Sequence, residues 1–229
     1  MTPGGCGAVV SLVCGAEGAG AEVDRRADIR ERALKDLMQS EVLMRDGHFD
    51  YGNGYHGAIY LNPHRLFRHP STIWRLAQDL LDLIPGDILH QTDVVAGPVT
   101  GGALLAHTMA GLLDSRRSLT HPPSSFAPLN YDPGAGGLSL RPFYRDTLKS
   151  RRVLLADDVR NTGETLARCA ALVRAAGGAV LATAEICDRA GTIVDAGVPN
   201  IAVAEFKAAE NYPAATCALC RAGVPVTRF

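Results

Sequence analysis

VLLADDVRNTGETL, residues 153–166, is the stretch of the chain that decides its predicted fold. The apolar start predicts a buried strand over Arg152–Ala156, which brings Asp157 and Asp158 to the carboxyl end of that strand. The hydroxyl, amide and glycine groups from Val159 to Thr165 then predict a turn that opens a helix. Because ligands of parallel α/β sheets bind at the carboxyl ends of strands, the same residues predict a ligand site.

The predicted turn is suited to one phosphate group, because backbone N–H groups and the positive end of the helix dipole converge on it. Thr162 and Thr165 can add hydroxyl donors, and Gly163 lets the backbone approach a ligand closely. The two carboxylates disfavour a neighbouring anion unless one ligand presents hydroxyls to the acids and phosphate to the turn. A ribose 5-phosphate has that layout. Taken alone, the acid pair equally fits an acidic strand end before a capped helix, as in receiver domains.

Strands and helices alternate through most of the chain. The sequence predicts strands at residues 93–96, around Phe126, and at 152–156, 179–187 and 201–206. It predicts helices at residues 25–44, 71–84 with Ser71 as N-cap, 102–113 and 163–176. Short apolar strands spaced by helices predict a parallel sheet covered on both faces. We therefore expect one α/β domain over residues 25–229, preceded by a flexible Gly/Ala-rich tail over residues 1–24.

Composition favours a small-molecule partner. The formal net charge of the 229 residues is −1, so no global positive field attracts nucleic acid or an anionic membrane. No Lys or Arg precedes Arg25, which leaves the basic region of a signal peptide missing, and no apolar run reaches the roughly 18 residues of a membrane span. The six cysteines are too scattered for a disulfide framework, so we expect a protein of the reducing cytoplasm.

The 153–166 string resembles the 5-phosphoribosyl-1-pyrophosphate (PRPP) motif of the type I phosphoribosyltransferases. The resemblance implies a Rossmann-like parallel core with a small hood built from N-terminal and C-terminal segments. It implies that Asp157 and Asp158 bind the ribose hydroxyls. It also implies that the 5-phosphate of PRPP is bound by Asn161, Thr162, Gly163, Glu164 and Thr165.

A second segment, VVAGPVTGGALLA at residues 94–106, is similar to the pyrophosphate loop of that family. Alone it fits a plain structural turn, because a strand, a glycine turn and a helix often follow one another. By the resemblance, Thr100, Gly101 and Gly102 contact the pyrophosphate. The resemblance further implies Mg²⁺ as cofactor, bound mainly through PRPP, and no protein metal ligand is predicted.

Three more stretches resemble the orotate phosphoribosyltransferase branch of the family: Gly47-His48-Phe49 with the run NGYHGAIYLN after it, Asp188-Arg189, and CALCRAGVPV near the end. The resemblance implies that Tyr60 lies beside the base, that Asn161 is close to it, and that Arg189 pairs with its carboxylate. The implied reaction is transfer of phosphoribose from PRPP to orotate, giving orotidine 5′-monophosphate and pyrophosphate in pyrimidine synthesis. A homodimer is also implied.

Some residues depart from the pattern of that branch. Gly52 replaces the usual Lys or Arg, Asn161 replaces a Thr, and the expected mobile loop between Phe126 and Leu140 lacks its lysine. The cations near that loop that could substitute are Arg141, Arg145 and Lys149. These departures leave two alternatives, a phosphoribosyltransferase for another base and a PRPP-binding protein without turnover.

Cys217-x-x-Cys220 has the spacing of half a zinc site. The sequence supplies no second pair of ligands at a convincing spacing, and we interpret His48 and His56 as structural residues. Whether Cys217 and Cys220 bind a metal stays open at the level of sequence.

Overall fold

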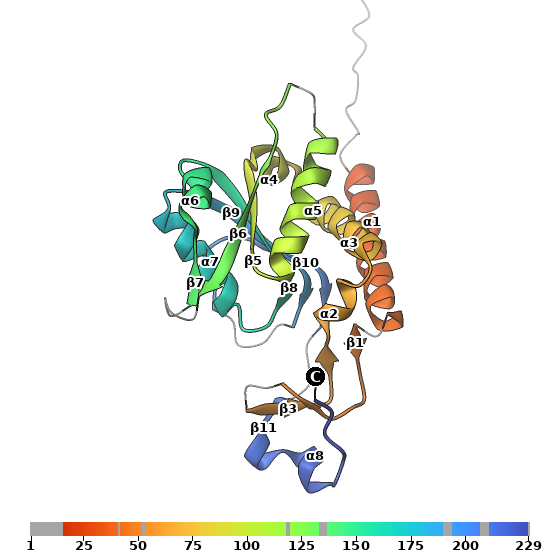
Figure 1. The fold of residues 1–229 in the computed structure, drawn as a ribbon. Helices are drawn as coiled ribbons and strands as arrows, with labels where there is room; N and C mark the ends of the chain where they lie inside the picture. Colours follow the sequence, from red (N-terminus) through yellow and green to blue (C-terminus); the bar gives the residue numbers. More distant parts are fainter. Residues whose placement is uncertain are drawn as a thin grey trace, which may run out of the picture.

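The computed structural model describes residues 16–40, 42–51, 54–117, 120–132, 137–189, 194–206 and 211–228. A six-stranded sheet in the order β10-β9-β8-β5-β6-β7 forms its centre (Figure 1). Its strands are β5 (Val94–Pro98), β6 (Ser125–Asp132), β7 (Gly137–Ser139), β8 (Arg152–Arg160), β9 (Ala179–Asp188) and β10 (Asn200–Glu205). All neighbours pair in parallel except β6 and β7, which are antiparallel. The predicted parallel sheet is thus confirmed, and β7 is a strand that the sequence did not indicate.

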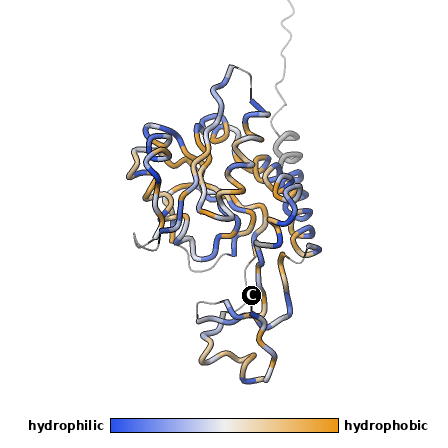
Figure 2. The backbone as a smooth tube through the Cα atoms, viewed as in Figure 1, coloured by the Kyte–Doolittle hydropathy of each residue, from blue (hydrophilic) through white to orange (hydrophobic). Residues whose placement is uncertain are grey.

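Helices cover both faces of this sheet. One face packs against α1 (Ala16–Gln39), α3 (Pro70–Leu83) and α5 (Gly101–Ser115), and the other against α6 (Pro142–Leu148) and α7 (Glu164–Ala175). Strand β8 shows the alternation: Leu154 and Ala156 are buried under the first helix layer, and Val153 and Leu155 under the second. Figure 2 shows the hydrophobic stretches concentrated along the central strands.

The first helix differs at both ends from its prediction. It begins at Ala16 rather than Arg25, so residues 16–24 of the predicted flexible tail are helical, which fits the high helix propensity of alanine. Ion pairs of Arg25 with Asp82 and of Arg32 with Asp79 attach this helix to α3. It ends at Gln39 rather than Met44 because residues 43–44 pair with a strand instead. Residues 1–15 lie outside the described residues.

Helix α3 carries the predicted apolar stripe, with Ile73, Leu76 and Leu80 all buried. Its N-cap is His69, not Ser71 as predicted, because Pro70 occupies the first helical position, where a missing N–H costs nothing. The helix stops before Pro85 as predicted: Ile84 is extended, as a residue preceding proline tends to be. A short helix, α4 (Gly86–Gln91), follows directly.

An N-terminal segment and the C-terminal segment of the chain together form a small hood on one side of the main sheet (Figure 1). Its three-stranded sheet has the order β11-β3-β2, and a two-stranded ribbon β1-β4 connects it to the body. The hood elements are β1 (Leu43–Met44), β2 (Phe49–Asp50), β3 (Tyr55–Gly57), β4 (Tyr60–Leu61), α2 (Pro63–Leu66), β11 (Asn211–Pro213), the 3-10 turn Ala214–Thr216 and α8 (Ala218–Arg221). The hood of N-terminal and C-terminal segments is therefore confirmed. None of the helices in the described ranges combines the length and apolarity that a bilayer span requires.

Candidate active site

The two predicted acids lie within β8 rather than just beyond it. The strand continues to Arg160 because its pairing with β9 continues, with Asp157 opposite Glu185 and Arg160 opposite Asp188. Asp157 is buried, with 6% of its surface exposed, and Asp158 is partly exposed. The N–H of Asp158 donates to Oδ1 of Asp157 over 2.9 Å, so the two residues are held side by side.

The surroundings of the pair act on its charge. Burial, and next the negative charge of Asp158, raise the pKa of Asp157 well above its ordinary value. The ligand-free protein therefore disfavours a full negative charge on both acids. A ligand that brings positive charge or hydroxyl donors to the pair would relieve that cost.

The start of α5 lies directly against the acid pair. A Cβ on Gly101 would come within 2.1 Å of Oδ2 of Asp158, and a Cβ on Gly102 within 2.8 Å of Oδ1 of Asp157. Only glycine leaves room for the carboxylates at these positions. Thr100, the N-cap of α5, is exposed beside them, and the Val99–Thr100 peptide bond is cis. The predicted pyrophosphate loop and the predicted ribose acids are thus brought together.

The turn after β8 forms a small open pocket. Gly163 caps α7 with a left-handed φ of +84°, which favours glycine, and the carbonyl of Thr162 accepts a 2.7 Å hydrogen bond from the N–H of Val194. Asn161, Thr162, Glu164 and Thr165 are exposed. The pocket has a volume of about 60 Å³ and is lined by residue 157 and residues 159–166. The pocket is small and open, so it suits a group of a few atoms such as a phosphate.

Two of the three predicted base-binding residues, Arg189 and Tyr60, contact the same tyrosine, Tyr51. The guanidinium of Arg189, just after β9, lies 4.9 Å from the ring centroid of Tyr51, and its Nη2 donates to the Tyr51 hydroxyl over 3.3 Å. The Tyr51 ring stacks on that of Tyr60, with centroids 6.3 Å apart. The structure therefore links Arg189 to Tyr60 through Tyr51, a residue that the sequence did not single out.

Arg189 follows directly after a largely buried ion pair between Arg160 and Asp188. Nη1 of Arg160 lies 2.8 Å from Oδ2 of Asp188, and the carbonyl of Arg160 accepts the N–H of Arg189 over 2.9 Å. A fully buried acid, Glu185, lies deeper on β9 and accepts a 2.6 Å hydrogen bond from Asn200. Burial raises the pKa of Glu185 to about 8. Since Asp157 and Glu185 are paired neighbours, the acid pair and this network share one edge of the sheet.

The cations and loop residues that the sequence also suggested lie on helix α6, at the opposite edge of the sheet, or outside the described residues. Gly52, Asn53 and residues 133–136 of the expected mobile loop lie outside the described residues. Arg141 and Arg145 are exposed at helix α6. Lys149 lies against Gly177, which precedes β9, and so sits at the amino-terminal edge of the sheet, opposite the acids. The structure thus separates Lys149 from the acid pair.

A larger pocket of about 570 Å³ also lies away from the acids. It is formed by α4, the end of α5, residues 116–117 and residues 120–122, at the amino-terminal edge of the sheet. Parallel sheets bind ligands at the opposite edge, so the smaller pocket beside Asp157 is the better candidate site.

Comparisons with known proteins agree with this arrangement. No protein-family model matches the chain. It is 32% identical over 174 residues to the orotate phosphoribosyltransferase of Bartonella tribocorum, covering 76% of this chain and 84% of that protein. It is 28% identical over 199 residues to that of Caldanaerobacter subterraneus subsp. tengcongensis, covering 87% and 96%. The crystal structure of orotate phosphoribosyltransferase from Aeropyrum pernix matches with a TM-score of 0.58 and 25% identity, over 75% of this chain and 92% of that one.

Proposed function

Because the chain belongs to the orotate phosphoribosyltransferases, we propose that it transfers the phosphoribosyl group of PRPP to orotate in pyrimidine synthesis. The products are orotidine 5′-monophosphate and pyrophosphate. The observation that carries the proposal is the contact of Asp157 and Asp158 with the glycines of the α5 start on one side, next to the pocket of residues 159–166. An acid pair between two anion-binding helix starts suits a sugar that carries phosphate at both ends.

We assign the two ends of PRPP to the two turns. The 5-phosphate binds the exposed turn of residues 161–165, with Thr162 and Thr165 as hydroxyl donors, and the pyrophosphate binds the loop of residues 100–102. Asp157 and Asp158 bind the ribose hydroxyls. The close fit of the two glycines against the carboxylates supports this layout. It places the loop and the acids so close together that one PRPP molecule can contact both.

Catalysis follows from the charge of the acids. As the bond between C1 of the ribose and pyrophosphate breaks, positive charge grows on the ring, and nearby carboxylates stabilise it. The ring nitrogen of orotate forms the new bond at C1 and gives up its proton to the departing pyrophosphate, which leaves with the electron pair of the broken bond. The side chains beside the proposed PRPP site offer carboxylate and hydroxyl oxygens, which are the ligand atoms that Mg²⁺ prefers. This ion, bound mainly through PRPP, would neutralise charge on the departing pyrophosphate.

We propose that Arg189 recognises the carboxylate of orotate. Its guanidinium lies over the Tyr51 ring, and the planar fork of a guanidinium suits bidentate pairing with a carboxylate. Tyr60, stacked on the other tyrosine, lies beside the base, and Asn161 belongs to the adjoining turn. The ion pair of Arg160 with Asp188 positions Arg189 through the Arg160 carbonyl.

We further propose a homodimer that acts in the cytoplasm. Val99 and Leu104 are apolar side chains exposed at 44% and 43%, and they line a hollow of about 400 Å³ beside Thr100. A second copy covering this patch would remove apolar surface from water next to the site. The four described cysteines, Cys169, Cys187, Cys217 and Cys220, form no disulfide, which fits a reducing compartment. Sedimentation of the protein, with Leu104→Glu as the dissociating variant, tests the dimer.

The decisive experiment mixes the protein with PRPP, Mg²⁺ and one base at a time, and measures pyrophosphate release. Orotate is expected to react, and uracil, which lacks the carboxylate, is expected to react far more slowly. Release with another base alone would favour the alternative suggested by Asn161. Tight PRPP binding in calorimetry without release from any base would replace the enzyme with a binding protein.

A further inference from the structure

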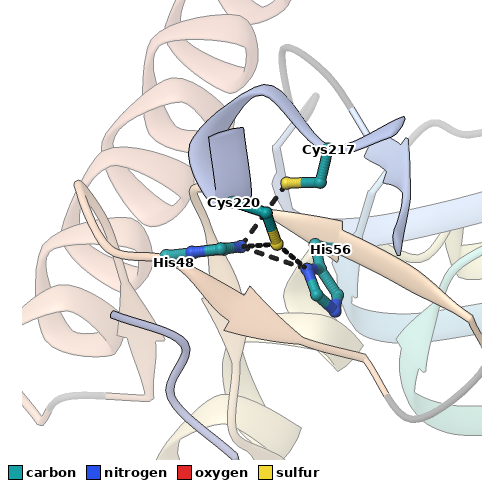
Figure 3. A group of neighbouring side chains, drawn as sticks. All are labelled: His48, His56, Cys217 and Cys220. Atoms are coloured by element: carbon teal, nitrogen blue, oxygen red, sulfur yellow. Dashed lines mark hydrogen bonds between the residues drawn. The ribbon is translucent and has the colours of Figure 1, made fainter. Parts of the chain in front are cut away.

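Four side chains that lie far apart in the sequence converge inside the hood: His48, His56, Cys217 and Cys220 (Figure 3). One ligand atom from each lies within 4.8 Å of all the others. Nε2 of His48 is 3.1 Å from Nδ1 of His56 and 3.4 Å from Sγ of Cys217. Sγ of Cys220 is 3.3 Å from Nδ1 of His56 and 3.7 Å from Nε2 of His48. The second pair of ligands that sequence spacing did not supply is therefore present in space.

These distances match the edges of a zinc tetrahedron. With Zn–N near 2.0–2.1 Å and Zn–S near 2.3 Å, tetrahedral geometry separates two nitrogens by about 3.3 Å and a nitrogen from a sulfur by about 3.6 Å. The single nitrogen pair here is separated by 3.1 Å, and three of the four nitrogen–sulfur pairs are separated by 3.3, 3.4 and 3.7 Å. Four of the six edges of the tetrahedron therefore already have lengths close to those of a zinc site.

The outer nitrogen of each histidine also faces an acceptor. Nδ1 of His48 lies 2.7 Å from the carbonyl of Val224, and Nε2 of His56 lies 3.9 Å from a carboxylate oxygen of Asp50. A metal-bound histidine usually donates its second ring N–H to a carbonyl or carboxylate, which leaves the inner nitrogen unprotonated and aimed at the metal. Both imidazoles have the orientation that such a site needs.

The burial of the hood leads to the same conclusion. Among the described side chains of residues 212–228, Cys217 alone is buried, and its neighbours in the interior are the histidines, at 1% and 6% exposure. Strands β2 and β3 bury one large apolar side chain, that of Phe49. It belongs to neither large hydrophobic cluster of the body. The three-stranded sheet β11-β3-β2 and the C-terminal segment therefore have little apolar core of their own, and a structural metal is a common source of stability for such a unit.

We propose that His48, His56, Cys217 and Cys220 bind one structural Zn²⁺ ion that joins the C-terminal segment to the hood. Two thiolates and two imidazoles in a tetrahedron select zinc over the hard cation that accompanies PRPP. Four protein ligands leave no open coordination position, so the ion holds structure rather than taking part in the chemistry. The site is separate from the acid pair, and it stands whether or not the protein uses orotate.

The zinc ion would also shape the proposed base site. Tyr51 lies between the two histidines in the sequence, directly after β2, and its hydroxyl meets Arg189. Fixing both histidines fixes the strands on either side of this tyrosine. If the proposed function holds, loss of zinc raises KM for orotate while the affinity for PRPP changes little.

Metal analysis of the intact chain tests the proposal. The protein is produced without a polyhistidine tag in zinc-supplemented medium, and its metal content is measured by mass spectrometry after extensive dialysis. One zinc per chain is expected. Cys220→Ser and His56→Ala should each lose most of the zinc, while Cys169→Ala and His90→Ala, which alter the same residue types elsewhere, should keep it.

Cobalt provides a test that does not depend on how the variants fold. Co²⁺ added to the chelator-stripped wild-type protein should give the strong visible bands of tetrahedral cobalt and a thiolate charge-transfer band, and zinc should displace both. Full-length protein with neither zinc nor a cobalt spectrum would overturn the proposal. So would a Cys217–Cys220 disulfide in freshly purified protein, or zinc that persists in both ligand variants.

Discussion

Oδ2 of Asp158 occupies the space that a side chain on Gly101 would need, 2.1 Å from the position of its Cβ. Gly101→Ala should therefore displace either the carboxylate or the start of α5 and lower kcat/KM for PRPP by about 100-fold or more, since small misplacements are costly in catalysis. Gly111→Ala is the matched control, because the same helix has open space there and should gain slightly in stability. Steady-state kinetics with thermal unfolding of both variants decide the matter, and equal activities would contradict the proposed contact.

Asp158→Asn should lower turnover by about 100-fold or more while the protein stays folded, because it removes a charge and little volume from a partly exposed position. Asp146→Asn on the exposed surface of α6 is its control. Turnover is followed by pyrophosphate release and folding by circular dichroism. Unchanged turnover would remove Asp158 from the mechanism.

Asp157→Asn should separate stability from activity. The pKa of Asp157 is raised in the folded protein, so the protonated acid stabilises the fold at low pH, and that contribution is lost as pH rises through the folded pKa. An uncharged asparagine avoids this loss. The melting temperature of the variant minus that of wild type should therefore be larger at pH 9 than at pH 5. The variant should still lose turnover. A variant that is less stable than wild type at high pH would refute the burial argument.

Glu185→Gln provides a pH test at a buried acid that takes no part in the proposed mechanism. The folded pKa of about 8 lies above the ordinary value of 4.5, so the contribution of Glu185 to stability is complete below pH 4.5 and is lost as pH rises to about 8. Glutamine keeps an acceptor for Asn200 and cannot ionise. Relative to wild type, it should gain about 2–4 kcal/mol between pH 5 and pH 9. Denaturant unfolding across this range measures the difference, and parallel curves would contradict it.

Arg189→Lys and Arg189→Ala should weaken orotate binding, with KM for orotate rising about 10-fold and 100-fold, because lysine loses the fork and alanine loses the charge as well. Arg151→Ala, exposed at the other edge of the sheet, is the control. Calorimetry with PRPP should give similar affinities for all three variants. An unchanged KM for orotate would transfer the carboxylate-binding role to another residue.

Residues close together in the chain were predictable, and contacts between distant residues were not. The acids, the turn and the helix of residues 153–166 could be predicted because their chemistry is local, and the parallel sheet because its strands are apolar throughout. The error at Ser71 has a local cause: Pro70 starts the helix earlier than the hydroxyl suggested. The first helix ends at Gln39 because the following residues, Leu43 and Met44, pair with β4. The local sequence around Gln39 does not indicate this pairing.

The hood could not be predicted in detail for the same reason. Strands of two or three residues are too short to show periodicity, so β11 was not assigned. Tyr51 became part of the candidate base site only through its contact with Arg189, 138 positions away. The spacing of Cys217 and Cys220 indicated half of a metal site, while its other half comes from residues about 170 positions earlier.

The order in which the hood is assembled also affects how the protein matures. Strand β3 pairs on one side with β2, made early, and on the other with β11, and Thr227 hydrogen-bonds to the backbone of His48 and Asp50. The hood is therefore completed only after residues 211–228 have been synthesised, whereas β5, β6 and β8 of the main sheet come earlier in the chain. A product truncated before residue 211 would carry the turn of residues 161–165 but lack a finished hood.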